Sequence, residues 1–190
     1  GRTAMASGES QWITGPAARA DVQRLRAMSC AVVTGIGTVL SDDCSLTVRA
    51  DELGLPSAEA GLASQKQPLR VVLDSALQTP LGAKVLDGSA PTLLCYDAQC
   101  SPSDAISATG VEQVPLRRGK HGLDLATLLD NLSGRQSNEI LVECGPRLAG
   151  AFLAEGLLDE IIVYMAPVLM GSNARPLLDL PLDSMSQKVP

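Results

Sequence analysis

A carboxylate just before a glycine–proline turn is the clearest chemical feature of the sequence. Glu143 follows the apolar run 139–142, which predicts a short buried strand. Gly145 and Pro146 come next, and proline suits the first position of a helix because its missing N–H is not needed there. The exposed N–H groups of that helix start, together with the helix dipole, favour an anionic group such as a phosphate. Many such turns bind nothing, so this stretch alone leaves a ligand site and a plain turn about equally open.

A second glycine turn repeats this arrangement earlier in the chain. Residues 30–34 predict a strand, which runs into Gly35 and Gly37. The third glycine of the dinucleotide-binding fingerprint is absent, so this motif is weak by itself. Two glycine turns at strand ends in one chain are more suggestive of a phosphate-binding site than either turn alone.

Charged residues lie near both turns. Asp42 and Asp43 follow the earlier turn, where paired acids are often only capping groups. A helix is predicted over 17–28, with Gly15 as its N-cap and Pro16 at its first position. Its arginines are Arg19, Arg24 and Arg26. Such arginines usually form a solvated face, although one that points past the helix end could hold a phosphate.

The rest of the sequence excludes several kinds of chemistry. His121 is the only histidine, it lies in a predicted loop, and no G-x-S-x-G motif is present, which argues against a Ser-His-Asp hydrolase. The sequence has neither zinc ligands at close spacing nor a P-loop, so no metal site is predicted. Hydride transfer from a bound nicotinamide fits what is left, because the cofactor carries the reactive atom and the protein mainly positions it.

The elements that would position these residues alternate between strands and helices. Further strands are predicted at 69–73, 92–96, 111–116 and 161–165. Two more helices are predicted, one over 123–132 and one from Pro146 to Gly156. The apolar stripe of the first consists of Leu125, Leu128, Leu129 and Leu132. Residues 51–68, rich in Ala, Gly, Ser and Gln, are expected to form a mobile surface excursion. The alternation predicts an α/β domain with a mostly parallel central sheet flanked by helices.

The composition indicates one domain with an aliphatic core. The chain has 190 residues, of which 45% are hydrophobic and only 2% aromatic, and scarce aromatic residues argue against single-stranded nucleic acid as a ligand. The net charge of −6 has the wrong sign for binding nucleic acid or an anionic membrane. The longest apolar run is too short to span a bilayer. The five scattered cysteines form no C-x-x-C pair, which favours reduced thiols in a cytoplasmic protein.

Five stretches together resemble one family. They are GRTAMASGESQWIT, TVLSDDCSLTVR, VVLDS, VECGPRLAGAFL and DEIIVYMAPVLMGSNAR. In this order they look like the reductase half of the bacterial bifunctional riboflavin-biosynthesis deaminase–reductases (RibD type). The resemblance implies a dihydrofolate-reductase-like fold and a 5-amino-6-(5-phosphoribosylamino)uracil reductase, in which NADPH delivers a hydride to the ribose C1′ to form the ribitylamino product. It also implies a homodimer, and a zinc-dependent diaminohydroxyphosphoribosylaminopyrimidine deaminase domain fused upstream.

The resemblance assigns roles to residues by matching position. The substrate-contacting positions are Ser10, Arg26, Leu46, Arg49 and Glu143. The NADPH-contacting positions are Trp12, Thr38, Asp42, Ser75, Gly145, Pro146, Arg147, Leu148, Ala149, Gly150 and Ala151. Arg26 and Arg49 suit a clamp on the sugar phosphate, because guanidinium matches phosphate geometry. Without the family, Trp12 would be interpreted as a core aromatic and Ser75 as a strand-end cap. The proton could come from water or from a carboxyl group, and the two catalytic candidates, Asp42 and Glu143, stay equally open.

The sequence departs from the family pattern at a few points. Cys44 stands where proline is common, and Gly15 where serine is common. The resemblance also implies one strand before Gly1 and further strands after Pro190, so we expect the chain to be part of a longer protein. Two alternatives remain: another dihydrofolate-reductase-like NADPH reductase with a different small substrate, and a nucleotide-binding module without activity.

Overall fold

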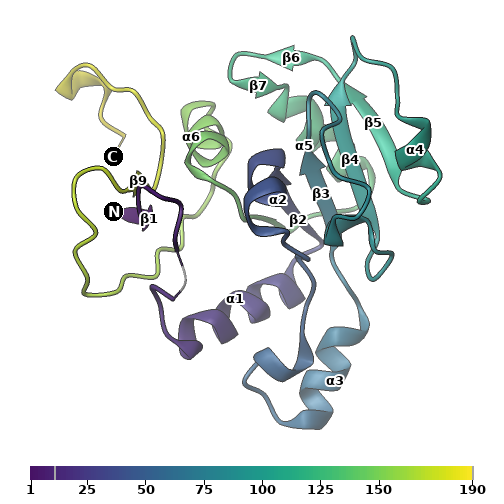
Figure 1. Cartoon of the computed structure of the whole chain (residues 1–190), viewed down its shortest axis with the longest axis horizontal. Coiled ribbons are helices and arrows are strands. Elements are labelled where there is room, and N and C mark those ends of the chain that lie inside the picture. Colours follow the sequence, from purple (N-terminus) through teal and green to yellow (C-terminus); the bar gives the residue numbers. More distant parts are fainter. Residues whose placement is uncertain (11, 190) are drawn as a thin grey trace.

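A central parallel sheet of five strands organises the computed structural model, which describes residues 1–10 and 12–189 (Figure 1). The strand order is β5-β4-β3-β2-β8, and every neighbouring pair is parallel. The strands are β2 (Ala31–Gly35), β3 (Leu69–Leu73), β4 (Thr92–Asp97), β5 (Glu112–Leu116) and β8 (Ile140–Val142). The predicted parallel α/β sheet is thereby confirmed, with strand boundaries within two residues of those expected from the sequence.

Helices cover both faces of this sheet because its central strands are apolar on both sides. Along β2, Ala31 and Val33 face a core that includes α5 (Leu125–Gly134) and α6 (Pro146–Ala154). Val32 faces the opposite core, where Val39 of α2 (Ile36–Asp42) packs. The predicted leucine stripe of α5 is confirmed, since Leu125, Leu128 and Leu132 are buried and Leu129 packs against them.

Two smaller groups of elements lie at the margins of the sheet. The short helix α4 (Asp104–Ser107) packs Ile106 against β4, and the hairpin of β6 (Arg118–Gly119) and β7 (Gly122–Leu123) follows β5. The 3-10 turn η2 (Lys84–Leu86) buries Val85 and Leu86 beneath the face that carries α2. Within the described residues, no helix has the length and apolarity needed to cross a membrane.

The segment 51–68, expected to be a mobile surface excursion, contains regular structure that was not predicted. It holds most of the turn η1 (Ala50–Glu52) and the helix α3 (Ser57–Gln65), which starts after Pro56. Leu53 and Ala60 are buried against the end of α1 (Pro16–Met28), and α1 and α3 lie together below the sheet in Figure 1. The small apolar contact of Leu53 and Ala60 with α1 stabilises the helix α3 in a segment whose composition gave no helix signal. Gly15 and Pro16 occupy the predicted N-cap and first position of α1.

The two ends of the chain lie together beside α6 (Figure 1). The strands β1 (Arg2–Ala4) and β9 (Arg175–Pro176) form a short antiparallel pair, while η3 (Met185–Gln187) lies near the C-terminus. The strand predicted at 161–165 is wrong, since this segment is irregular and no backbone partner pairs with it in the described part of the chain. A strand needs a neighbour for its N–H and C=O groups, and apolar sequence alone does not supply one.

The strand order creates one point at which the chain reverses direction across the sheet. From β2 the chain moves outward through β3, β4 and β5, and it then returns to place β8 on the other side of β2. Ligands of open α/β sheets collect at such a switch point, beyond the carboxyl ends of the strands. The two predicted glycine turns, after β2 and after β8, meet at this position.

Candidate functional site

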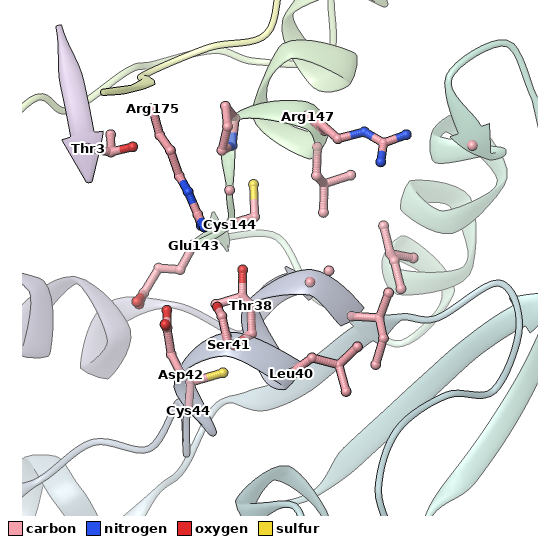
Figure 2. A pocket seen from close by; sticks show the side chains of 18 of the residues that line it. Thr3, Thr38, Leu40, Ser41, Asp42, Cys44, Glu143, Cys144, Arg147 and Arg175 are labelled. Atoms are coloured by element: carbon pink, nitrogen blue, oxygen red, sulfur yellow. Dashed lines mark hydrogen bonds between the residues drawn. The ribbon is translucent and has the colours of Figure 1, made fainter. Parts of the chain in front are cut away.

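A cavity of about 970 Å³ opens at the switch point between β2 and β8 (Figure 2). The carboxyl ends of β2, β3 and β8 contribute Gly35, Leu73 and Glu143 to its wall. The helix starts of α2 and α6, the β6–β7 hairpin and the β1–β9 pair complete it. The volume lies within the range of small-molecule and cofactor sites, about 300–1,000 Å³.

Both helix starts in this cavity have a glycine as their N-cap. Gly35 precedes α2 and Gly145 precedes α6, and neither helix has a side-chain cap on its first N–H groups. A Cβ atom added at Gly37 or Gly145 would meet no atom within 4 Å. The N-terminus of α6 therefore offers free N–H groups to an anionic ligand without a side chain in the way.

Arg26 and Glu143 form a two-pronged ion pair at one side of the cavity. Nε of Arg26 donates to Oε1 of Glu143 at 2.6 Å, and Nη2 donates to Oε2 at 2.7 Å. Nη1 of Arg26 also donates to the Thr47 carbonyl at 3.1 Å. Burial opposes the charge of Arg26, but the hydrogen bond and charge of Glu143 outweigh it and raise the arginine pKa above its ordinary value. Each ion fixes the other, so neither side chain is free to reorient.

The loop after α2 approaches the site in a strained conformation. Leu46 is buried and adopts a φ of +53°, in the left-handed region that costs a non-glycine residue roughly 1–2 kcal/mol. Arg70, which is fully buried on β3, donates to the Ser45 carbonyl at 3.3 Å and to the Ala90 carbonyl at 2.7 Å. These bonds tie the loop that carries Leu46 to the sheet and help hold the strained residue in place.

Two cysteines line the cavity as neutral thiols. Burial raises the pKa of Cys44 to about 11, and charges on Asp42, Arg26 and Glu143 act on the same thiol. Burial likewise raises the pKa of Cys144 to about 12. Because the thiolate is the nucleophilic form, neither cysteine suits nucleophilic catalysis at neutral pH.

The two candidate carboxyl groups face each other across the cavity. Figure 2 shows the side chains of Asp42, from the end of α2, and Glu143, from the end of β8, directed toward one another. Asp42 is exposed and has no hydrogen-bond or ion-pair partner among the described residues, whereas Arg26 engages both oxygens of Glu143. A bidentate guanidinium stabilises the ionised carboxylate. The two acids therefore have different environments although the sequence could not separate them.

Most of the residues expected in the site line this one cavity. They are Ser10, Arg26, Thr38, Asp42, Leu46, Ser75, Glu143, Gly145, Pro146, Arg147 and Leu148. Their chain positions span more than a hundred residues, and the parallel sheet brings them together because the carboxyl ends of its strands meet at one edge.

Five expected residues lie outside this cavity. Trp12 is 72% exposed, stacks on Arg19 and lines a second hollow of about 960 Å³, so the alternative of a core aromatic does not hold. Arg49 pairs with Glu52 at 2.7 Å beside α1. The others, Ala149, Gly150 and Ala151, lie within α6. A Cβ at Gly150 would come within 2.0 Å of the Asp179 carbonyl, so this glycine faces the C-terminal segment. Their predicted roles stay predictions.

Several cavity residues had no role in the sequence-based assignment. Thr3, Gly8 and Arg175 come from the β1–β9 region, Gln78 from the loop after β3, and His121 from the β6–β7 hairpin. The sequence placed His121 in a surface loop, which is correct, but this loop borders the cavity. Arg175 belongs to the GSNAR stretch of the family resemblance, and that stretch was the only signal that could have singled it out.

Comparisons with known proteins agree on the family and fold. The family model for the RibD C-terminal domain matches residues 1–187. The riboflavin biosynthesis protein RibD of Escherichia coli (strain K12) is 45% identical over 183 residues, covering 95% of this chain and 49% of that protein. The corresponding protein of Haemophilus influenzae is 42% identical, covering 95% of this chain and 48% of that protein. The chain thus spans about half the length of these curated relatives.

Solved structures extend the comparison to three dimensions. Acinetobacter baumannii RibD (form 1) is 42% identical with a TM-score of 0.84, covering 100% of this chain and 49% of that chain. The riboflavin biosynthesis reductase Rib7 of Saccharomyces cerevisiae shares the fold at 14% identity, with a TM-score of 0.70 over 96% of this chain and 74% of that one. These neighbours confirm the predicted dihydrofolate-reductase-like fold. The chain belongs to the RibD C-terminal domain family.

Proposed function

We propose that the chain is the NADPH-dependent reductase of riboflavin biosynthesis that acts on 5-amino-6-(5-phosphoribosylamino)uracil. Membership of the RibD C-terminal domain family supports an oxidoreductase on an aminouracil substrate. The observation that carries the proposal is the cavity at the β2–β8 switch point, where an uncapped helix start, two glycine turns and two facing carboxyl groups converge.

The residues around the two helix starts fit a dinucleotide cofactor. No atom lies within 4 Å of where a Cβ would stand at Gly37 or Gly145, and Thr38 and Ser75 line the wall of the cavity. Arg147, at the start of α6, adds a positive charge that suits a phosphate. When bound, NADPH would supply the hydride. The residues would position the nicotinamide and exclude water around it.

Ser10, Arg26, Leu46 and Glu143 line the part of the cavity that we assign to the substrate. The Arg26–Glu143 pair is held rigidly, so it offers a fixed pattern of donors and acceptors to polar groups of the ligand. Two N–H groups of Arg26 remain after its bonds to Glu143 and Thr47. Arg26 can therefore still donate to a ligand oxygen, although most of its charge is already balanced.

Asp42 is the better candidate for handling the proton. In the ring-opened substrate the C1′–nitrogen double bond accepts a hydride at C1′ and a proton at nitrogen. Arg26 engages both oxygens of Glu143, whereas Asp42 is exposed in the cavity and has no partner among the described residues, so its carboxyl group is accessible to a bound water. We assign proton delivery to Asp42, directly or through a bound water, and substrate orientation to Glu143.

NADPH oxidation, followed at the nicotinamide absorbance band, tests this proposal. The assay uses the full-length protein and the deaminated pyrimidine ribosyl phosphate as substrate. We expect turnover with this substrate and NADPH. Binding of NADPH without turnover would favour an inactive nucleotide-binding module, and turnover with a different small carbonyl or imine substrate would favour another reductase of the same fold.

The proposal extends to the assembly of the whole protein. The chain spans about half of its curated relatives, which is consistent with a deaminase domain fused to it. We propose a zinc deaminase domain upstream, a homodimer and a cytoplasmic location. Analytical ultracentrifugation of the full-length protein tests the dimer, since a monomer at micromolar concentration would contradict it.

A further inference from the structure

A guanidinium without a partner lies at the Glu143 end of the cavity. Figure 2 shows the side chain of Arg175 extending from β9 toward Glu143 and Cys144. In the described part of the chain, it makes neither an ion pair nor a side-chain hydrogen bond. The other arginine at this end, Arg26, already has its charge balanced by Glu143. Arg175 therefore supplies the uncompensated positive charge on this side of the site.

The backbone around Arg175 is built to hold this position. In the β1–β9 pair, Arg175 lies opposite Ala4, and both Ala4 and Ala174 are buried. Nη1 of Arg2 donates to the Ala174 carbonyl at 2.8 Å, and the hydroxyl of Thr3 donates to the Pro176 carbonyl at 3.2 Å. The residues on both sides of Arg175 are thus anchored, which directs its side chain into the cavity.

Gly8 leaves the space that the guanidinium occupies. A Cβ atom at Gly8 would lie 2.9 Å from Nη2 of Arg175, so the guanidinium would have to shift from its position to make room. The φ of Gly8 is +98°, in a turn closed by the bond from its N–H to the Met5 carbonyl at 2.9 Å. A glycine at this position suits both the turn and the arginine beside it.

We propose that Arg175 binds a phosphate group at the Glu143 end of the cavity and makes the site selective for a phosphorylated ligand. This inference rests on the proposed function for the identity of that ligand. The phosphate belongs to the sugar of the substrate or to the cofactor, and in either case two of its oxygens can accept parallel bonds from the guanidinium. Arg175 would act beside Arg26, which is paired with Glu143 but keeps two free N–H groups, while Arg49 pairs with Glu52 outside the cavity.

Equilibrium binding to the full-length protein tests the proposal without depending on turnover. Isothermal titration calorimetry would compare ribose 5-phosphate, ribose and NADPH on the wild type, Arg175→Ala and Arg175→Lys. We expect Arg175→Ala to weaken one phosphorylated ligand roughly 10- to 100-fold, the range for a lost hydrogen bond to a charged group. Arg175→Lys should recover part of the lost affinity, because lysine keeps the positive charge but lacks the paired N–H donors of the guanidinium. Arg117→Ala, an exposed arginine outside the cavity, is the matched control.

Gly8→Ala provides a second variant, because its Cβ requires the guanidinium to shift while Arg175 stays in the chain, although it also strains the turn at Gly8, whose φ is +98°. We expect it to weaken the same ligand as Arg175→Ala does. If only the affinity for ribose 5-phosphate falls, the phosphate bound by Arg175 belongs to the substrate. If only the affinity for NADPH falls, it belongs to the cofactor. Unchanged binding of both phosphorylated ligands, or an equal loss for ribose and ribose 5-phosphate, would overturn the inference. A wild type that binds ribose 5-phosphate but oxidises no NADPH would refute the proposed reaction while leaving the role of Arg175 testable.

Discussion

At the scale of single residues, the site separates two carboxyl groups that have the same chemistry. Glu143 shares both of its oxygens with Arg26, at 2.6 and 2.7 Å, while Asp42 faces it without a partner in the described residues. The difference arises from packing, because Arg26 of α1 lies beside the end of β8 and pairs with Glu143 there. Asp42, at the end of α2, has no such partner among the described residues. One acid is therefore suited to orienting the substrate, and the other is accessible to water in the cavity.

This division of roles predicts a clear contrast between two isosteric variants. Asp42→Asn should lower kcat roughly 100-fold or more, because it removes a general acid, while the KM for the pyrimidine substrate changes little. Glu143→Gln should mainly raise that KM, because Arg26 loses its charged partner and its fixed position. Steady-state NADPH oxidation over a range of substrate concentrations separates the two effects. The opposite pattern, with kcat lost only in Glu143→Gln, would reverse the assignment.

The cysteines provide a test of the electrostatics at the same scale. Burial raises the pKa of Cys44 to about 11 and that of Cys144 to about 12, so at pH 8 both remain protonated and unreactive. The pKa of Cys30 is lowered by backbone hydrogen bonds at Glu139 and Asn138. Alkylation by iodoacetamide, followed by mass spectrometry of peptides, should therefore modify Cys30 before Cys44 and Cys144 at pH 8.

The alkylation rates of Cys44 and Cys144 should keep rising as the pH increases above 9, because the thiolate fraction of each cysteine grows until the pH passes its raised pKa. Cys44→Ser identifies the contribution of that position. Rapid modification of Cys44 at pH 7 would contradict a buried neutral thiol.

Single residues also show where sequence reasoning succeeded and where it stopped. Gly145 and Pro146 were placed correctly, because a turn between a strand and a helix depends on local backbone preferences. Arg175 was missed because its position depends on pairing with a strand more than 170 residues away. Gly150 was expected to contact a cofactor, but the nearest atom to its missing Cβ belongs to Asp179. Local signals predict turns, and only the tertiary structure decides which side chains meet.

At the scale of elements, Arg70 connects the sheet to the loops that carry the site. Its guanidinium is fully buried and donates to Thr92, to the carbonyls of Ser45 and Ala90, and to Asp87. One side chain thus joins the strand β3 to the loop before β4 and to the loop that ends at Leu46. Removing it would leave buried carbonyl groups without donors.

Arg70→Met should therefore lower the free energy of unfolding by roughly 2–4 kcal/mol, since several buried acceptors lose their partner at once. Urea denaturation followed by far-ultraviolet circular dichroism measures this loss. Asp87→Asn is the matched comparison, and it should cost less than about 1 kcal/mol because Asp87 is partly exposed. We also expect Arg70→Met to raise the KM for the substrate, because Leu46 loses the support for its left-handed backbone. Equal stability of the two variants would show that Arg70 does not organise these loops.

The strand that was predicted wrongly and the helix that was not predicted share one physical cause. The segment 161–165 has the apolar composition of a buried strand, yet a strand forms only where a neighbour accepts its hydrogen bonds. The helix α3 has a composition that suggests a loop, yet Leu53 and Ala60 find a small apolar contact with α1. In contrast, α5 was predicted well because its leucine stripe contains the signal within ten residues. Periodic elements can be read from the chain, whereas elements that depend on distant partners cannot.

At the scale of the whole molecule, the strand order explains why the site lies where it does. The order β5-β4-β3-β2-β8 separates the chain on either side of β2, so the loops after β2 and β8 diverge and leave a cavity between them. Any parallel sheet with this order would have a crevice at the same place. The specific chemistry then depends on the residues that line this crevice, such as Asp42, Glu143 and Arg175.

A run of exposed apolar side chains lies apart from this cavity, along the irregular segment 161–169. Met165 is 87% exposed and Leu169 is fully exposed, and Ile161, Ile162, Val163 and Val168 are each about half exposed. Exposed apolar side chains in such a run are unfavourable in water and should bind the hydrophobic dye ANS. We expect dye fluorescence with the 190-residue chain to fall substantially in the double variant Met165→Lys and Leu169→Lys, while the free energy of unfolding changes by less than about 0.5 kcal/mol, as for other surface substitutions.

Met185→Lys is the matched control, since Met185 is 79% exposed but lies in η3, outside this segment. It should leave dye binding nearly unchanged. If the double variant binds as much dye as the wild type, the apolar segment is covered in solution by another part of the protein or by a second copy. Sedimentation velocity at several concentrations then separates these cases, because only coverage by a second copy makes the sedimentation coefficient rise with concentration.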